Sequence, residues 1–158
     1  MTERAGQVLS IHLLREQRTP PQPVAAARAV VGQGLEGDVH GKKRDDDRRQ
    51  VLILDATTLR DFGLRPGDLR EQITVEFPIL EQLPAGTRLR IGPVTFELTG
   101  PCEPCTHIGT VLDVVDRVAF QQQLAGRRGQ LARVVEAAGD GIIRVGDAVG
   151  EVSLAASE

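Results

Sequence analysis

The sequence predicts a mainly β domain whose strands close into a barrel. Three observations carry this prediction: short apolar runs of strand length follow one another, glycines or prolines interrupt them, and only two stretches have helical character. A chain of 158 residues is long enough for one domain with its own core and too short for two comfortable ones. We therefore expect a single domain over residues 1–158, of β-barrel type with a few short helices.

The predicted strands either alternate apolar and polar residues or form continuous apolar runs. Their ranges are 6–14, 26–34, 49–56, 71–77, the two halves of 87–100, 129–138 and 141–154. Residues 19–25 contain three prolines, so we expect an extended connection on the surface there. The sequence RPGD at 65–68 predicts a turn.

Two helices are expected between these strands. The first covers residues 57–63, where Thr57 could cap the start and Gly63 could end the helix. The second covers residues 110–126, in which apolar residues recur at helical spacing. These apolar residues are Val111, Leu112, Val115, Val118, Ala119 and Leu124.

Composition excludes several classes of function. The chain has four Phe and neither Trp nor Tyr, so it lacks the aromatic platforms on which single-stranded bases stack. A net charge of −3 and a pI near 5.7 argue against general binding of nucleic acid. No stretch resembles a signal peptide or a membrane span of about 20 apolar residues. Two cysteines without an export signal indicate reduced thiols, and we expect a cytoplasmic protein.

Residues 34–50, GLEGDVHGKKRDDDRRQ, form the most unusual stretch of the sequence. A solvated surface loop is one interpretation. A site for an anion is the other, because glycines allow backbone N–H groups to approach a phosphate and basic side chains complement its charge. The basic residues are Lys42, Lys43, Arg44, Arg48 and Arg49. His40 could contact an anion or a proton, whereas His12 lies in an apolar strand and is expected to be structural.

The two cysteines, Cys102 and Cys105, form a C-x-x-C motif with several interpretations. A zinc site would need His107 and either His40 or an aspartate as further ligands. A redox pair is suggested by Pro104, although such motifs normally open a helix inside a βαβ unit, and β-rich sequence precedes this one. Two buried thiols without a function are a third interpretation. The fourth is one working thiolate between a strand and a helix, stabilised by helix N–H groups and His107.

Five segments, taken together and in order, resemble the MOSC domain, which is named after the C-terminal domain of molybdenum-cofactor sulfurase. The segments are GLEGDVH with the basic loop and RQVLIL, RPGDLREQITVE, LPAGTRLRIGPVTFELTG, PCEPC, and RVVEAAGDGIIRVGDAV. The resemblance runs from about Gly6 to Val149. It implies a β-barrel related to the insert domain of pyruvate kinase, in agreement with the predicted strands.

The resemblance also implies a function with molybdenum cofactor, a pterin that ends in a phosphate. Cys105 matches the family cysteine, which carries sulfur as a persulfide or ligates molybdenum, and Cys102 and His107 could support it. The expected cradle of the cofactor consists of Gly37, Asp38, His40, Lys42, Lys43, Arg44, Arg48, Arg49, Gln72 and Arg128. Gln72 stands where the family usually has Asn.

Some larger relatives contain a pyridoxal-phosphate desulfurase domain, and none is expected within this chain. A sulfur-carrying role would therefore require a separate cysteine desulfurase, and a role in a molybdenum-dependent reductase would require an electron-transfer protein. Two other interpretations stay open: a non-catalytic module that binds or carries the cofactor, and a small zinc- or redox-active C-x-x-C domain. Neither nucleic acid nor a membrane is expected as a partner.

Overall fold

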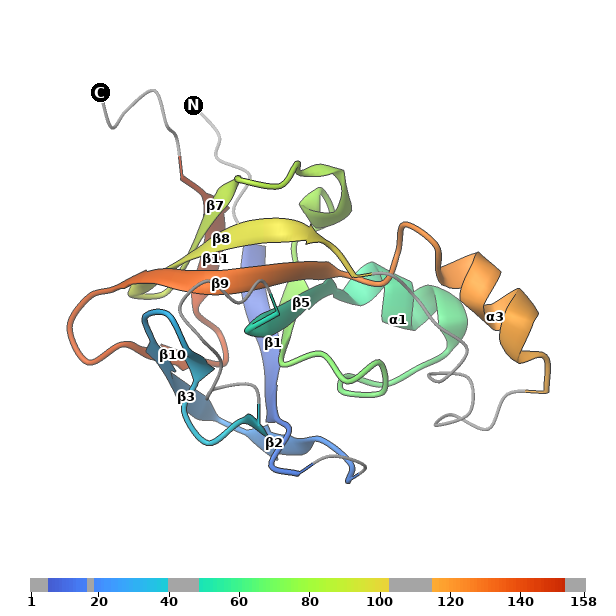
Figure 1. Cartoon of the computed structure of the whole chain (residues 1–158), viewed down its shortest axis with the longest axis horizontal. Coiled ribbons are helices and arrows are strands. Elements are labelled where there is room, and N and C mark those ends of the chain that lie inside the picture. Colours follow the sequence, from blue (N-terminus) through green and yellow to red (C-terminus); the bar gives the residue numbers. More distant parts are fainter. Residues whose placement is uncertain (1–5, 17–18, 40–48, 103–114, 153–158) are drawn as a thin grey trace.

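The computed structural model describes residues 6–16, 19–39, 49–102 and 115–152, and it shows a closed β-barrel (Figure 1). Seven of the described strands form the ring, in the order β11–β7–β8–β9–β5–β6–β1, and β1 pairs back to β11. Strand β2 extends the sheet beyond β1, and β10, β3 and β4 form a smaller sheet. The mainly β barrel predicted from the sequence is thus confirmed.

The bounds of the strands agree with most of the predicted ranges. They are β1 Gly6–Leu13, β2 Gln22–Val24, β3 Ala26–Val30, β4 Gly34–Leu35, β5 Val51–Asp55, β6 Ile73–Glu76, β7 Arg88–Ile91, β8 Val94–Pro101, β9 Gln130–Ala137, β10 Ile142–Arg144 and β11 Ala148–Glu151. Three predictions need correction. Residues 19–25 contain the short strand β2, the predicted strand 26–34 is divided by a turn, and the predicted strand 141–154 is divided into β10 and β11.

Aliphatic side chains fill the barrel, as the scarcity of aromatic residues requires. Phe77 and Phe96 are the aromatic members of this core, and both are buried. All five residues of β5 are buried, because the barrel interior covers one face of the strand and helices cover part of the other. Burial of each such aliphatic side chain contributes about 1.5–3 kcal/mol. Strand β5 is therefore held on both faces.

Helix α1, Ala56–Phe62, lies in the connection between β5 and β6, the one parallel pair among the described strand pairings. Its N-cap is Asp55, whose Oδ2 accepts a hydrogen bond from the backbone N–H of Thr57 at 3.0 Å. The prediction of Thr57 as the cap was therefore wrong by two residues. Gly63 ends the helix in a left-handed conformation, with φ +68°, as predicted.

Helix α3, Arg117–Leu124, is shorter than the predicted helix 110–126. Residues 110–114 lie outside the described part of the chain. Val115 precedes the helix and is fully exposed, and Val118 is 56% exposed, so these two residues do not belong to a buried apolar face as predicted. Phe120 and Leu124 instead pack in a second apolar cluster outside the barrel, with Leu54, Leu59 and Leu69.

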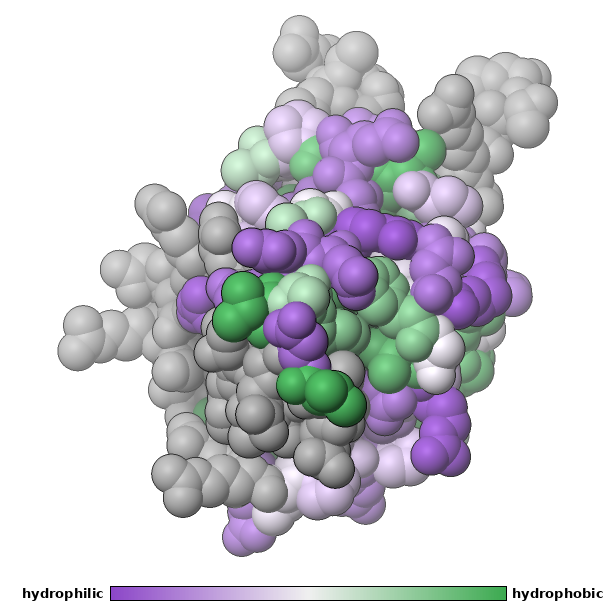
Figure 2. Space-filling model, turned by 90° about the vertical axis from the view of Figure 1, so that its right-hand side faces the viewer, coloured by the Kyte–Doolittle hydropathy of each residue, from purple (hydrophilic) through white to green (hydrophobic). Residues whose placement is uncertain are grey.

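Figure 2 shows the end of the molecule that carries α1 and α3, where apolar surface lies between hydrophilic side chains. A 3-10 helix, η2 (Leu80–Gln82), follows β6 and leads through a turn into β7. No helix in the described ranges has both the length and the apolar character needed to cross a membrane.

Candidate functional site at the end of strands β8 and β9

The candidate site lies where β8 ends and β9 begins. Pro101 pairs with Gln130 at this end of the two strands. The next residue, Cys102, donates its backbone N–H to the carbonyl oxygen of Gly129 at 2.9 Å, and its side chain is half-buried. The structure therefore places the first cysteine of the C-x-x-C motif beside the segment that contains Arg128. Cys105 and His107 lie outside the described residues.

Gly129 brings this segment close to strand β5. Its φ is +94°, a conformation that residues with a side chain rarely adopt. A Cβ atom at this position would lie 2.6 Å from the carbonyl oxygen of Ile53, which is backbone and cannot rotate away. Only glycine therefore allows the backbone next to Arg128 to approach β5 this closely.

Arg128 is a buried cation with unsatisfied donors. It is 9% exposed, and its Nε and Nη1 atoms have no hydrogen-bond partner among the described residues. Unsatisfied donors on a buried charged group are costly, because water has been removed from them without replacement. Such donors are typical of a site that receives an anionic group.

Glu71 supplies the nearby negative charge and is completely buried. Its Oε2 accepts hydrogen bonds from the backbone N–H of Gly67 at 2.8 Å and from the Thr74 hydroxyl at 2.6 Å. Its Oε1 has no partner among the described residues. Burial raises the pKa of this carboxyl, while the two hydrogen bonds and the Arg128 charge lower it.

Asp38 and Gln72, two of the predicted cradle residues, contact each other in the structure. The Gln72 side chain donates its Nε2–H to the Asp38 carboxylate at 3.3 Å and accepts the backbone N–H of Leu52 at 2.8 Å. Asp38 also accepts the backbone N–H of Leu14 at 2.7 Å. Both side chains are buried. Their described contacts connect β1, β5 and the start of β6 to the turn that precedes the basic loop.

Gly37 precedes Asp38 in this turn. Its φ is +88°, and a Cβ there would lie 2.6 Å from a guanidinium nitrogen of Arg15. Among the other predicted residues, Arg49 is exposed. His12 is buried in β1, and burial lowers its pKa although the Asp68 carboxylate raises it; this agrees with a structural role. The remaining predicted residues, His40, Lys42, Lys43, Arg44 and Arg48, lie outside the described residues.

Two acidic residues at this end of the barrel were missed by the sequence analysis. Glu71 is one, and Glu81 of η2 is the other, whose Oε2 accepts the backbone N–H of Gly129 at 2.8 Å. Glu71 lies two residues before β6, and no feature of its neighbours in the sequence indicates that it is buried. No local signal distinguished Glu81 from a surface residue, because its burial depends on the distant Gly129 segment.

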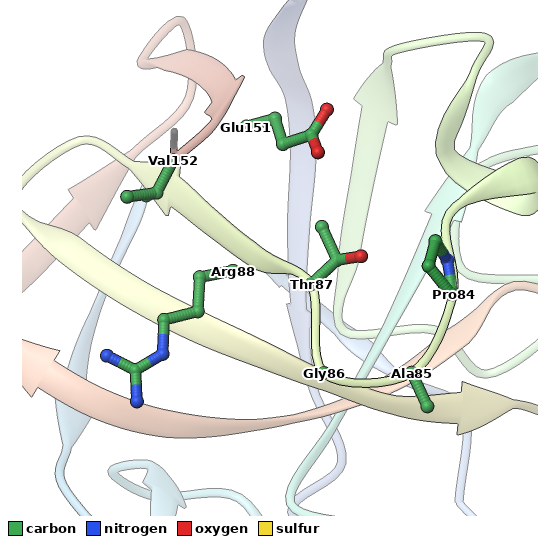
Figure 3. A pocket seen from close by; sticks show the side chains of 7 residues that line it. All are labelled: Pro84, Ala85, Gly86, Thr87, Arg88, Glu151 and Val152. Carbon is green, nitrogen blue, oxygen red and sulfur yellow. The ribbon is translucent and has the colours of Figure 1, made fainter. Parts of the chain in front are cut away.

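A pocket of about 600 Å³ lies elsewhere, at the turn between η2 and β7. Its lining residues are Pro84, Ala85, Gly86, Thr87, Arg88, Glu151 and Val152. Figure 3 shows that the Arg88 guanidinium and the Glu151 carboxylate point away from each other. The Nε atom of Arg88 instead lies 4.0 Å from the Oε2 atom of Glu97. The pocket therefore offers no converging charges, and we assign the site to Arg128.

Metal ligands do not gather in the described residues. Within these ranges, no group of three or more His, Cys, Asp or Glu residues is arranged to hold a metal ion. Most of the residues considered for a zinc or molybdenum site fall in the ranges 40–48 and 103–114, namely Cys105, His107, His40 and the loop aspartates Asp45, Asp46 and Asp47. The described part of the site is therefore a buried arginine beside a segment that holds a cysteine.

These features define a small β-barrel protein with a buried arginine and a cysteine at one end of its strands. The MOSC domain family matches residues 38–150, and the chain belongs to this family. No curated protein matches the sequence.

Solved structures show the same fold at low sequence identity. The YuaD protein from Bacillus subtilis is 20% identical with a TM-score of 0.78, covering 92% of this chain and 94% of that protein. YiiM from Geobacillus stearothermophilus is 18% identical with a TM-score of 0.70, covering 94% of this chain and 75% of that protein. YiiM from Escherichia coli is 18% identical with a TM-score of 0.66, covering 93% and 70%.

Proposed function

We propose that this chain binds molybdenum cofactor at the Arg128 site and that Cys105 works beside it. Membership of the MOSC domain family supports a function associated with this cofactor. The observation that carries the proposal is Arg128, whose buried Nε and Nη1 atoms have no partner among the described residues. Guanidinium and phosphate form strong, often bidentate hydrogen bonds, so these donors fit a ligand that ends in a phosphate.

The remaining cradle residues would divide into two groups. The basic side chains would neutralise the anionic ligand, and these are Lys42, Lys43, Arg44, Arg48 and Arg49, with His40 as a further donor. Gly37, Asp38 and Gln72 would position the turn from which the basic loop starts, because their described contacts are with the framework. The bound cofactor would supply a redox-active molybdenum, for which a thiolate is a suitable soft ligand.

Cys105 would act as a thiolate, with Cys102 and His107 as supporting groups. As a sulfur carrier, the Cys105 thiolate attacks the outer sulfur of a donor persulfide; the donor's S–S bond breaks, and the donor leaves as a thiolate. A separate cysteine desulfurase would provide that persulfide, because no pyridoxal phosphate is expected in this chain. If Cys105 ligates molybdenum in a reductase, a separate electron-transfer protein would provide the electrons.

The assignment of Arg128 can be tested with a neighbouring control. Arg127 pairs with Asp61 and stacks on Phe62, so it offers the same charge in a surface setting. We expect Arg128→Gln to lower retention of cofactor about tenfold or more, as loss of a charge-assisted contact implies, and Arg127→Gln to preserve it. Native mass spectrometry and molybdenum analysis would measure this in protein from cells that make the cofactor. Equal retention in both variants would refute the site.

The role of the cysteines is tested in the same preparation. Cys105→Ala should abolish retention of cofactor or formation of a persulfide, and Cys102→Ala should preserve most of it. Equal loss in both variants would favour a paired redox or zinc role. One zinc per chain, without molybdenum, would favour a small zinc-stabilised domain over the function proposed above.

A further inference from the structure

Three side-chain hydrogen bonds connect η2 and Leu83 after it to Gly129 and to Gln130, the first residue of β9. Glu81 Oε2 accepts the backbone N–H of Gly129 at 2.8 Å. In return, Gln130 donates its Nε2–H to the carbonyl oxygens of Leu80 at 3.1 Å and Leu83 at 2.8 Å. Gln130 is almost completely buried. This arrangement, the η2 clamp, makes the position of Gly129 depend on Glu81 and Gln130.

The η2 clamp acts on the backbone of the candidate site. The Gly129 N–H that Glu81 binds belongs to the peptide unit that begins at Arg128, and the Gly129 carbonyl oxygen accepts the Cys102 N–H at 2.9 Å. Gly129 itself lies tightly against Ile53, so its peptide units have little room to move. Glu81 is therefore connected through one residue to both the arginine and the first cysteine of the site.

Glu81 is also unusual in its charge. The pKa of its carboxyl is raised to about 7, and burial is the main cause. The Gly129 hydrogen bond and the Arg127 guanidinium lower this pKa, whereas the nearby Asp55 carboxylate raises it. Asp55 caps α1, and Arg127 precedes Arg128 and pairs with Asp61. These are the charged groups that act on Glu81 in the described structure. The Gly129 hydrogen bond therefore favours the carboxylate of Glu81, and burial opposes it.

We propose that Glu81 is a positioning residue that holds Gly129, and through it Arg128 and Cys102, by accepting the Gly129 N–H. The inference rests on the proposed function for the meaning of the site, but the clamp itself is tested without cofactor. A neutral glutamine should keep the clamp, because its amide oxygen can accept the Gly129 N–H. A leucine of similar size should break it.

Amide hydrogen exchange by NMR, corrected for the intrinsic rate, tests the clamp directly. In the wild type, the Gly129 and Cys102 amides should be protected on both sides of pH 7, because the Glu81 carboxyl and its carboxylate can both accept the Gly129 N–H. Glu81→Gln should keep both amides protected across this range, and Glu81→Leu should lower their protection at least about fivefold at every pH. Glu76→Gln, a matched change at the surface ion pair with Arg60, should behave like the wild type. Equal protection in the Leu and Gln variants, or unprotected Gly129 and Cys102 amides in the wild type, would overturn the proposal.

Binding of inorganic sulfate, a dianion that does not titrate in this range, separates the clamp from the proposed function. Coulomb attraction alone predicts that Glu81→Gln and Glu81→Leu both strengthen binding, since both remove a negative charge. Positioning predicts that Glu81→Leu weakens binding at least about threefold relative to Glu81→Gln. Equal strengthening in both variants would refute positioning. If Arg128→Gln leaves sulfate binding unchanged, the assignment of Arg128 fails, and hydrogen exchange still decides whether the clamp exists.

Discussion

Gly129→Ala should destabilise the protein more than any other glycine substitution on the same segment. An alanine with φ near +94° is strained by about 1–2 kcal/mol. Its Cβ would lie 2.6 Å from the Ile53 carbonyl oxygen, and overpacking against backbone costs about 1–3 kcal/mol more. Reduced freedom of the unfolded chain returns about 0.4–1 kcal/mol. We expect the free energy of unfolding to fall by roughly 2–4 kcal/mol.

Gly126→Ala provides the matched control. Gly126 also has a positive φ, +75°, but nothing lies within 4 Å of its added Cβ. Only the backbone strain of an alanine at positive φ then remains, and the reduced freedom of the unfolded chain offsets part of it. We therefore expect the free energy of unfolding to fall by about 1 kcal/mol or less. Urea unfolding would measure both variants, with equal m-values as the condition for comparing midpoints. If the two variants differ by less than about 0.5 kcal/mol, which is the usual scatter of surface substitutions, the close approach to Ile53 is not real.

Three further changes test other parts of the structure. Asp55→Ala should lower the free energy of unfolding by about 2–3 kcal/mol, because Asp55 caps α1 and also accepts the Phe77 N–H at 2.6 Å. Thr57→Ala should lower it by less than about 1 kcal/mol. Equal losses in the two variants would contradict Asp55 as the cap. The pKa of Glu81 is raised in the folded protein, so its contribution to stability is complete below pH 4.5 and is lost as the pH rises through about 7. The free energy of unfolding of Glu81→Gln should therefore exceed that of the wild type by roughly 1–2 kcal/mol at pH 8 and equal it near pH 4. Thermal or urea unfolding at the two pH values would measure this difference. The asparagine in Gln72→Asn is one methylene too short to keep both the Leu52 N–H and the Asp38 carboxylate as partners, so the free energy of unfolding should fall by about 1–2 kcal/mol. An unchanged melting temperature would show that these contacts tolerate the residue usual in the family.

Most of the barrel could be predicted from the sequence, because a buried β-strand shows alternating or continuous apolar residues within a few consecutive positions. Strands β7 and β8 are joined at Gly92 as expected, and β9 alternates buried and half-buried residues from Gln130 to Val135. The helix cap could not be resolved in this way, since Asp55 and Thr57 are both good capping residues. The choice depends on the strand that places the Asp55 carboxylate over the first turn.

The site was harder to predict than the fold. Arg128 was selected through a resemblance to a family and Cys102 through the C-x-x-C motif, and nothing in their neighbouring residues indicates that Cys102 lies beside the Arg128 segment. The roles of Glu71 and Glu81 depend on burial by distant segments, which a single sequence does not reveal. The apolar spacing was misleading at Val115 and Val118, because these two residues are exposed in the structure, although Leu124 of the same predicted set is buried.

The closure of the ring has a consequence for how the protein folds. The barrel is sealed by the pairing of β1 with β11, in which Gly6 lies opposite Val149, so the seam joins the first and last described strands. A growing chain cannot form this seam until nearly all of it has left the ribosome, and the Gly6–Gln7 part of β1 lacks its β11 partner until then. Contacts so distant in sequence also form slowly, after local hairpins such as β7–β8. In pulse-labelled refolding, the amides of the seam should therefore become protected last, and dilute protein should refold in higher yield than concentrated protein, whose open edges can pair with each other.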